Sequence, residues 1–138
     1  MEYFPVTLKS AEPATLYAKD IKMFKIKDGN SLAVHAERLW GWVGEKRFLY
    51  INRQDLYDDY ENLFQALSAV TNNMAMRFSS TEGHVVPVYR IRSVKSTACR
   101  LEVQVDGVWF NGWFEYTDPR VRDQDYNTVM AMMRQWGK

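Results

Sequence analysis

The chain has 138 residues, of which 46% are hydrophobic and 25% are charged, and its 18 basic residues nearly balance its 17 acidic ones. This composition excludes a disordered chain, because it supplies enough apolar side chains to close one core at this length. The net charge of +1 also excludes a strongly basic protein that coats DNA along its whole surface. We therefore expect a single domain over residues 1–138.

The cysteine content and the hydrophobic runs indicate where the protein works. Its one cysteine, Cys99, cannot form a disulfide within the chain, which favours a reducing compartment. No run approaches the ~20 apolar residues that a membrane-spanning helix needs, and the first residues lack the pattern of a secretory signal. We expect a cytoplasmic protein that does not enter a membrane.

The first third of the chain has the alternating pattern of β-strands. Residues 3–9 predict a short strand, and residues 22–27 predict a second one that ends at the turn sequence Asp28-Gly29-Asn30. Residues 31–43 and 46–52 predict two further strands, because the second of these runs is rich in residues that favour β-structure.

The period then changes to that of an amphipathic helix over residues 54–70, with Asn52 as its N-cap. Acidic residues gather toward its N-terminal end, where they suit the helix dipole and make this part of the protein negative. The apolar stripe of this central helix consists of Leu56, Tyr60, Leu63, Phe64, Leu67 and Val70.

Strand patterns return over residues 85–94, 100–105 and 108–116. A terminal helix should follow, beginning at Asp118-Pro119 or nearer to Asp123. No repeat of fixed period divides the chain. The sequence therefore predicts an α+β fold with a mostly antiparallel sheet of about six or seven strands, one long central amphipathic helix and a C-terminal helix.

The turn sequence Asp106-Gly107 predicts a two-residue hairpin, which sets Val105 opposite Val108 and Arg100 opposite Trp113. A three-residue loop at 95–97 is preferred for the preceding hairpin, since it aligns apolar residues with apolar residues. The sheet then has two unlike faces. The apolar face comprises Tyr89, Ile91, Leu101, Val103, Val105, Val108, Phe110 and Phe114, and the other comprises Arg90, Arg92, Arg100, Glu102, Gln104, Trp109, Asn111 and Trp113.

The second face suggests a binding surface, because residues 90–100 hold four basic residues and no acidic one. Our preferred hypothesis is a non-catalytic inhibitor, adaptor or regulatory subunit that engages a protein partner, with tryptophans as anchors and arginines as bidentate contacts to carboxylates. The alternative is that these tryptophans and arginines have a structural role, either as exposed cation–π pairs or as a second small core. The residues proposed to bind the partner are Arg90, Arg92, Arg100, Trp109 and Trp113, joined by Trp40 and Trp42.

Two further functions remain open on the sequence. The same face could bind single-stranded nucleic acid, with bases stacked on the tryptophans and phosphates held by the arginines. A small hydrolase could use His84 or Cys99, although the chain has no glycine-framed nucleophile turn and none of the usual zinc-ligand spacings. We therefore expect no enzyme, no catalytic residues, no cofactor and no metal, and the sequence leaves the oligomeric state open.

Overall fold

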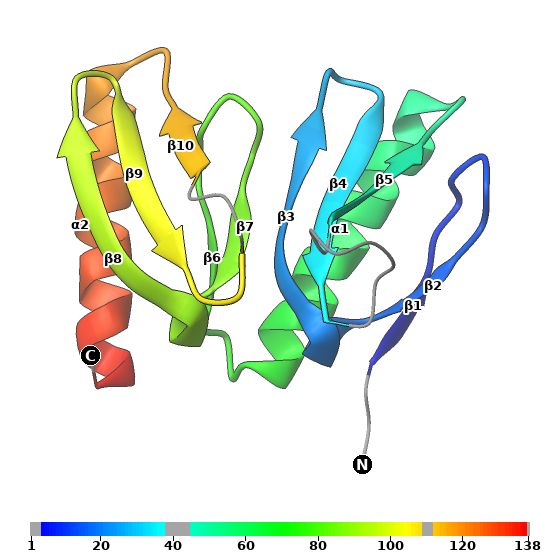
Figure 1. The fold of residues 1–138 in the computed structure, drawn as a ribbon, viewed down its shortest axis with the longest axis horizontal. Helices are drawn as coiled ribbons and strands as arrows, with labels where there is room; N and C mark the ends of the chain where they lie inside the picture. The colour runs from blue at the N-terminus through cyan, green and yellow to red at the C-terminus, as the bar shows by residue number, and fades with distance from the viewer. Residues whose placement is uncertain (1–3, 38–44, 109–111, 138) are drawn as a thin grey trace.

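The computed structural model describes residues 4–37, 45–108 and 112–137 (Figure 1). The α+β class is confirmed, with one central and one C-terminal helix. In the described part of the chain, ten short strands form three antiparallel sheets, where the sequence predicted six or seven strands in one sheet. The strand orders are β1-β2, β5-β4-β3-β7-β6 and β10-β9-β8.

The first half of the chain contains five strands, a 3₁₀ turn and a helix. Their bounds are β1 Pro5–Thr7, β2 Thr15–Tyr17, the 3₁₀ turn Ala18–Asp20, β3 Ile21–Lys27, β4 Ser31–Ala36, β5 Glu45–Leu49 and α1 Arg53–Val70. The second half follows the same order. Its elements are β6 Ala75–Arg77, β7 Val85–Pro87, the 3₁₀ turn Val88–Arg90, β8 Ile91–Thr97, β9 Arg100–Val105, β10 Gly112–Glu115 and α2 Pro119–Trp136.

The two halves are structural repeats, because equivalent backbone groups make equivalent hydrogen bonds. Leu8 N donates to the Ala14 carbonyl at 2.7 Å, and Phe78 N donates to the His84 carbonyl at 2.8 Å. Four more pairs of backbone hydrogen bonds correspond in the same way. They are Ala18–Phe4 and Val88–Met74, Glu37–Asp20 and Asp106–Arg90, Ala11–Leu49 and Thr81–Glu115, and Tyr50–Asn30 and Tyr116–Cys99.

This repeat is hidden from a search for a fixed period. Phe78 lies 70 residues after its equivalent Leu8, but Asp125 lies only 66 residues after its equivalent Asp59. The spacing shortens because the second half has tighter connections between its strands. The spacing between equivalent residues is therefore not constant, as the sequence analysis predicted, although the order of strands and helices is repeated.

A buried carboxylate joins three elements in each half. In the first half, Asp59 Oδ2 of α1 accepts hydrogen bonds from the Tyr50 hydroxyl at 2.6 Å and from Lys9 N at 2.7 Å. In the second half, Asp125 Oδ2 of α2 accepts from the Tyr116 hydroxyl at 2.7 Å and from Ser79 N at 2.6 Å. Burial and the aspartate raise the pKa of both tyrosines, so each hydroxyl keeps the proton that it donates.

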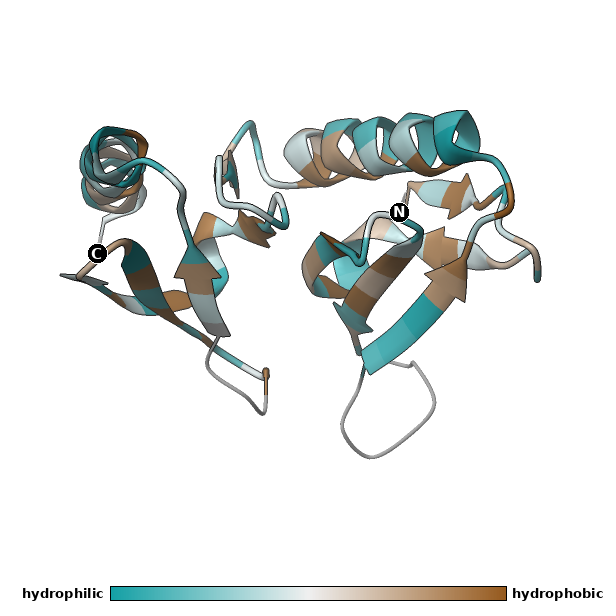
Figure 2. Cartoon of the chain, turned by 90° about the horizontal axis from the view of Figure 1, so that it is seen from above, coloured by the Kyte–Doolittle hydropathy of each residue, from teal (hydrophilic) through white to brown (hydrophobic). Residues whose placement is uncertain are grey.

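Both helices begin where the sequence predicts. The Asn52 side chain accepts from Gln54 N at 2.8 Å, and the Asp118 side chain accepts from Arg120 N at 2.9 Å, with Pro119 in the first helical position. The alternative start near Asp123 is wrong. Figure 2 shows that both helices lie on the same side of the sheets, with their apolar faces turned toward the strands.

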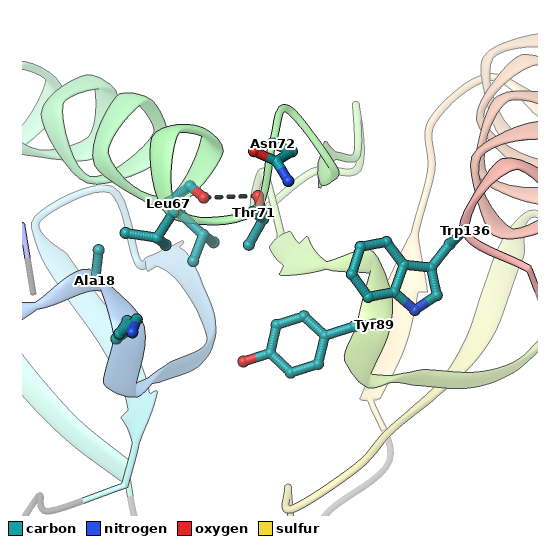
Figure 3. Close-up of a pocket in the computed structure, with 8 residues that line it drawn as sticks. Ala18, Leu67, Thr71, Asn72, Tyr89 and Trp136 are labelled. Carbon is teal, nitrogen blue, oxygen red and sulfur yellow. Dashed lines mark hydrogen bonds between the residues drawn. The ribbon is translucent and has the colours of Figure 1, made fainter. Parts of the chain in front are cut away.

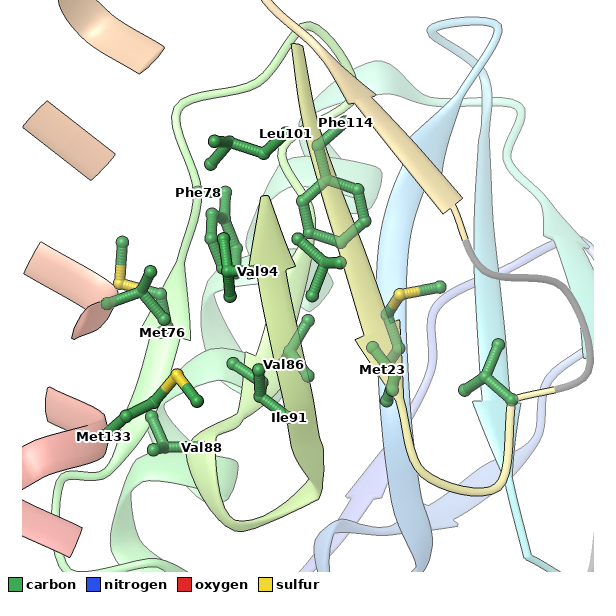
Figure 4. Packing of buried hydrophobic residues seen from close by; sticks show 14 of the residues in the cluster. Met23, Met76, Phe78, Val86, Val88, Ile91, Val94, Leu101, Phe114 and Met133 are labelled. Atoms are coloured by element: carbon green, nitrogen blue, oxygen red, sulfur yellow. The ribbon is translucent and has the colours of Figure 1, made fainter. Parts of the chain in front are cut away.

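The β6–β7 hairpin joins the two halves, because β7 pairs with the edge of β3 and Phe24 faces Val85 there. Val85 belongs to the core of the first half, whereas its neighbour Val86 belongs to the core of the second half. Met23 of β3 likewise enters the core of the second half (Figure 4). The hairpin is therefore shared by both cores.

The predicted register around Asp106-Gly107 is wrong by two residues. Gly107 has a positive φ of 83°, but Asp106 does not, so the turn is not the type that closes a two-residue hairpin. Strand β10 starts only at Gly112, and Trp113 faces Glu102 instead of Arg100. A shift of two residues keeps each side chain on its predicted face. The predicted pairings of residues 109–111 lie outside the described residues.

The predicted three-residue loop at 95–97 is also wrong, since β8 continues to Thr97 and turns through Ala98 and Cys99. A β-bulge between Ile91 and Ser93 corrects the alternation, so that Ile91 and Val94 both face the core. Alternation alone could not predict this extra residue. Tyr89, expected on the apolar face, lies in the 3₁₀ turn and is partly exposed.

We expect Asp59→Ala and Asp125→Ala each to lower the free energy of unfolding by about 3 kcal/mol, because each leaves a backbone N–H and a tyrosine hydroxyl without their acceptor. Urea unfolding measures this loss. The exposed Asp123 is the matched control, and Asp123→Ala should stay within about 0.5 kcal/mol of the parent. If only one of the two variants lost stability, the equivalence of the two carboxylates would be contradicted.

Stability should fall as the pH is lowered below about 6.5. Burial lowers the pKa of His84 to about 3, so between these two values the unfolded chain binds a proton that the folded chain does not. Each pH unit within this window costs up to about 1.4 kcal/mol for one such group. His84→Gln should flatten the profile, and NMR should show no titration of His84 between pH 8 and 5. An ordinary titration midpoint near 6.5 would refute this assignment.

Candidate functional site

An arginine and a tryptophan stack on the outer face of the sheet β10-β9-β8. Trp113 projects from the predicted outer face of β10 and is 43% exposed, which the sequence left open. The Arg100 guanidinium carbon lies 3.8 Å from the centre of its ring. The two residues are diagonal neighbours, because Trp113 faces Glu102 while Arg100 faces Glu115. The stack leaves a flat cationic group at the surface.

Two further cations lie on or beside this face. Arg92 occupies the bulge of β8, its side chain is 68% exposed, and its Nη2 lies 2.9 Å from Asp106 Oδ1. Lys95 is exposed and faces Glu102 across the strands. Both residues can reach a ligand that approaches from solvent.

Arg90 does not belong to this surface, contrary to the sequence prediction. Its side chain is only 12% exposed, because it lies in the 3₁₀ turn between the two halves. There Arg90 Nη2 donates to Glu37 Oε1 at 2.8 Å, and Nη1 donates to the Asp106 carbonyl at 3.3 Å. Although desolvation opposes its charge, the hydrogen bond to Glu37 raises the pKa of Arg90. Its role is to tie one half of the protein to the other.

The three other tryptophans of the predicted site lie outside the described residues. Trp40 and Trp42 belong to the connection between β4 and β5, and Trp109 belongs to the connection between β9 and β10. In the sequence these are equivalent connections of the two repeats. Their part in the site stays a prediction.

The face is less basic than the segment 90–100 suggested. Its described cations are Arg92, Lys95 and Arg100, and the neighbouring acidic residues are Glu102, Asp106 and Glu115. The surplus of positive charge counted over residues 90–100 is therefore balanced by acidic residues on the neighbouring strands. The charge becomes asymmetric only across the whole molecule.

The equivalent strands β3 and β8 supply cations on the strand side, whereas α1 is acidic. Strand β3 contributes Lys22, Lys25 and Lys27 and no acidic residue. Helix α1 holds four acidic residues and a single basic one, Arg53. Both helices lie on one side of the sheets (Figure 2), where α1 repels a polyanion and α2 carries Arg120, Arg122 and Arg134. Sequence reasoning predicted the acidic end of α1, but it could not show that β3 and β8 are equivalent strands.

The hydrolase alternative names His84, whose contact with Ser80 is buried in the described part of the chain. Ser80 Oγ and His84 Nδ1 lie 2.8 Å apart, but both residues are buried, and the His84 ring stacks on Phe114 with centroids 3.7 Å apart. Cys99 lies in the turn after β8. No group of three metal-ligating side chains occurs among the described residues, and none of their helices is long and apolar enough to cross a membrane.

A cleft of about 380 Å³ separates the two halves on their helix side (Figure 3). Tyr89 and Trp136 form one wall, with ring centroids 6.1 Å apart, and the C-terminal end of α1 forms the other. The lining is mainly apolar and contains no pair of groups suited to acid–base or nucleophilic chemistry. Its residues are Ala18, Lys19, Leu67, Val70, Thr71, Asn72, Tyr89 and Trp136.

No known family model matches the chain, and no curated protein matches it. Among solved structures, the chain is similar to a LytTr DNA-binding domain of a response regulator from Bacillus cereus. The likeness covers 91% of this chain and 95% of that domain, with a TM-score of 0.52 and 14% sequence identity, and at this identity it shows the fold. A DNA-binding neighbour contradicts the preferred sequence hypothesis of a protein partner and agrees better with the nucleic-acid alternative.

Proposed function

We propose that the chain binds DNA through the side of its sheets that faces away from the helices. The observation that supports this most is the likeness to a DNA-binding domain over 91% of the chain, which includes both repeats. The distribution of charge is consistent with it. We further propose that residues 1–138 act as one non-enzymatic domain, since the five-stranded sheet contains strands of both halves.

The proposed contacts to the phosphates come from the cations of β3 and β8. Several of these cations have acidic neighbours, such as Lys25 with Glu82 at 3.0 Å and Arg92 with Asp106 at 2.9 Å. Ion pairs at a surface are worth only about 0–1 kcal/mol, so a row of phosphates competes for exposed cations such as Arg92. Release of the counterions around DNA adds to the affinity and makes it dependent on salt.

The stack of Arg100 on Trp113 supplies a second kind of contact. A guanidinium held against an indole is already oriented, so it loses little freedom when it forms two parallel hydrogen bonds to a phosphate or to a guanine edge. The exposed indole also offers a surface on which an unpaired base can stack. We propose that the predicted Trp40, Trp42 and Trp109 contribute to the same side.

The double variant Arg92→Gln/Arg100→Gln should weaken DNA binding and make it less sensitive to salt. Loss of two phosphate contacts reduces the slope of log K against log salt by about 1.8. Fluorescence anisotropy with a labelled duplex at several salt concentrations measures both quantities. The matched control Arg120→Gln/Arg134→Gln removes the same charge from α2 and should bind as the parent does.

Two results would refute the proposed function. One is the absence of binding to duplex and single-stranded DNA at low salt. The other is an equal loss of affinity in the α2 control, which would show that DNA is attracted by the overall charge of the protein and not by one face.

Binding of single-stranded DNA can be distinguished with Trp113 and Trp136, which are both exposed in the described part of the chain. Trp113→Ala should cost about 1–3 kcal/mol in binding to single-stranded DNA if a base stacks on it. Trp136→Ala, which removes an equally exposed indole from α2, should change the affinity by less than two-fold. Equal effects of the two substitutions would place the DNA elsewhere.

A further inference from the structure

Within the chain, the two repeats are joined where β7 pairs with the edge of β3, and we call this contact the joint. Each end of the protein holds one unused half of the same joint. Strand β8 is an edge of the sheet β10-β9-β8, and β2 pairs with β1 alone among the described strands. Within the chain, the strands equivalent to these two do pair, because β7 adds to the edge of β3. The same edge and the same hairpin are thus present once more, at opposite ends of the molecule (Figure 1).

Three contacts between β3 and the β6–β7 hairpin contribute to the joint inside the chain. Phe24 faces Val85 across the strands. Ile26 N donates to the carbonyl of Glu82 at 2.9 Å. The Lys25 ammonium donates to the carboxylate of the same Glu82 at 3.0 Å, and this lysine is largely buried.

The ends of the protein retain the groups that such a joint needs. The equivalents of Lys25 and Glu82 are Lys95 and Glu12, so the charges are the same, and both residues are exposed. Within the described part of the chain, neither residue forms an ion pair. The equivalent of Ile26 is Ser96, which is exposed on the open edge of β8. Its N–H corresponds to the one that Ile26 uses to bind the hairpin.

We propose that copies of this chain associate head to tail, with the β1–β2 hairpin of one copy added to the β8 edge of the next. Lys95 of one copy then pairs with Glu12 of its neighbour, as Lys25 pairs with Glu82 within the chain. Such an interface is heterologous, so a row of any length keeps one free edge at one end and one free hairpin at the other.

The association between copies is weaker than the joint within the chain. Val94 and Thr15 replace the apolar pair Phe24 and Val85, and Thr15 is exposed. Two acidic residues, Asp106 and Asp20, stand where Glu37 and Arg90 form their ion pair. A lysine on an edge strand also limits indiscriminate pairing with other strands. The interface therefore forms at high local concentration.

Zero-length crosslinking of concentrated protein with a carbodiimide tests this contact directly. The intramolecular pair Lys25–Glu82 is the internal positive control, because its atoms already lie 3.0 Å apart. An equal mixture of ¹⁴N- and ¹⁵N-labelled chains identifies links between copies by mass spectrometry. We expect a Lys95–Glu12 link of mixed isotope. Recovery of the control link without any Lys95–Glu12 link would overturn the proposal.

Exchange of the two charges provides a second, independent test. Sedimentation velocity at high concentration should show less association for Lys95→Glu and for Glu12→Lys than for the parent, because each places like charges in the joint. A mixture of the two variants should associate again in alternating rows, because the edge of each variant then meets a hairpin residue of opposite charge on the other, and Arg134→Glu is the control. Loss without restoration in the mixture would contradict the pairing. Neither test contains DNA, so its outcome is separate from that of the proposed function.

Discussion

Each half of this protein depends on one buried carboxylate that holds a helix, a hairpin and the end of a strand together. A buried carboxylate is costly unless hydrogen bonds replace its water, and here a tyrosine hydroxyl and a backbone N–H both donate to its Oδ2. Because Asp59 and Asp125 sit on the helices, their partners fix where each helix crosses its sheet. The strands and their outward side chains take their positions from this arrangement.

Much of the fold could be predicted from local signals. The caps at Asn52 and Asp118 and the apolar stripe of α1 follow from local chemistry, and they are confirmed. Strands β1 and β7 lie within the predicted runs 3–9 and 85–94, whereas β2 and β6 were missed, since three residues are too few for a period to show. The registers also failed, because a bulge and the φ angle of Asp106 depend on tertiary contacts that no local pattern encodes.

The site was partly predicted. Alternation correctly places Trp113 and Arg100 on the outer face, because an error of two residues in register does not change the side of a sheet. It fails for Arg90, which belongs to a 3₁₀ turn and serves the contact between the halves. The charge balance also failed, since Glu102, Asp106 and Glu115 come from beyond the segment that was counted. Across the whole molecule, the equivalence of β3 and β8 determines where positive charge gathers.

The hairpin shared by both cores also affects the order in which the protein can fold on the ribosome. Residues 1–72 contain every strand of the first half, yet the edge of β3 stays bare until residues 75–87 have been synthesised. Until then Phe24 lacks its cross-strand neighbour Val85, and the nascent chain exposes an unpaired strand. Translation must therefore continue through residue 87 before the first half is complete.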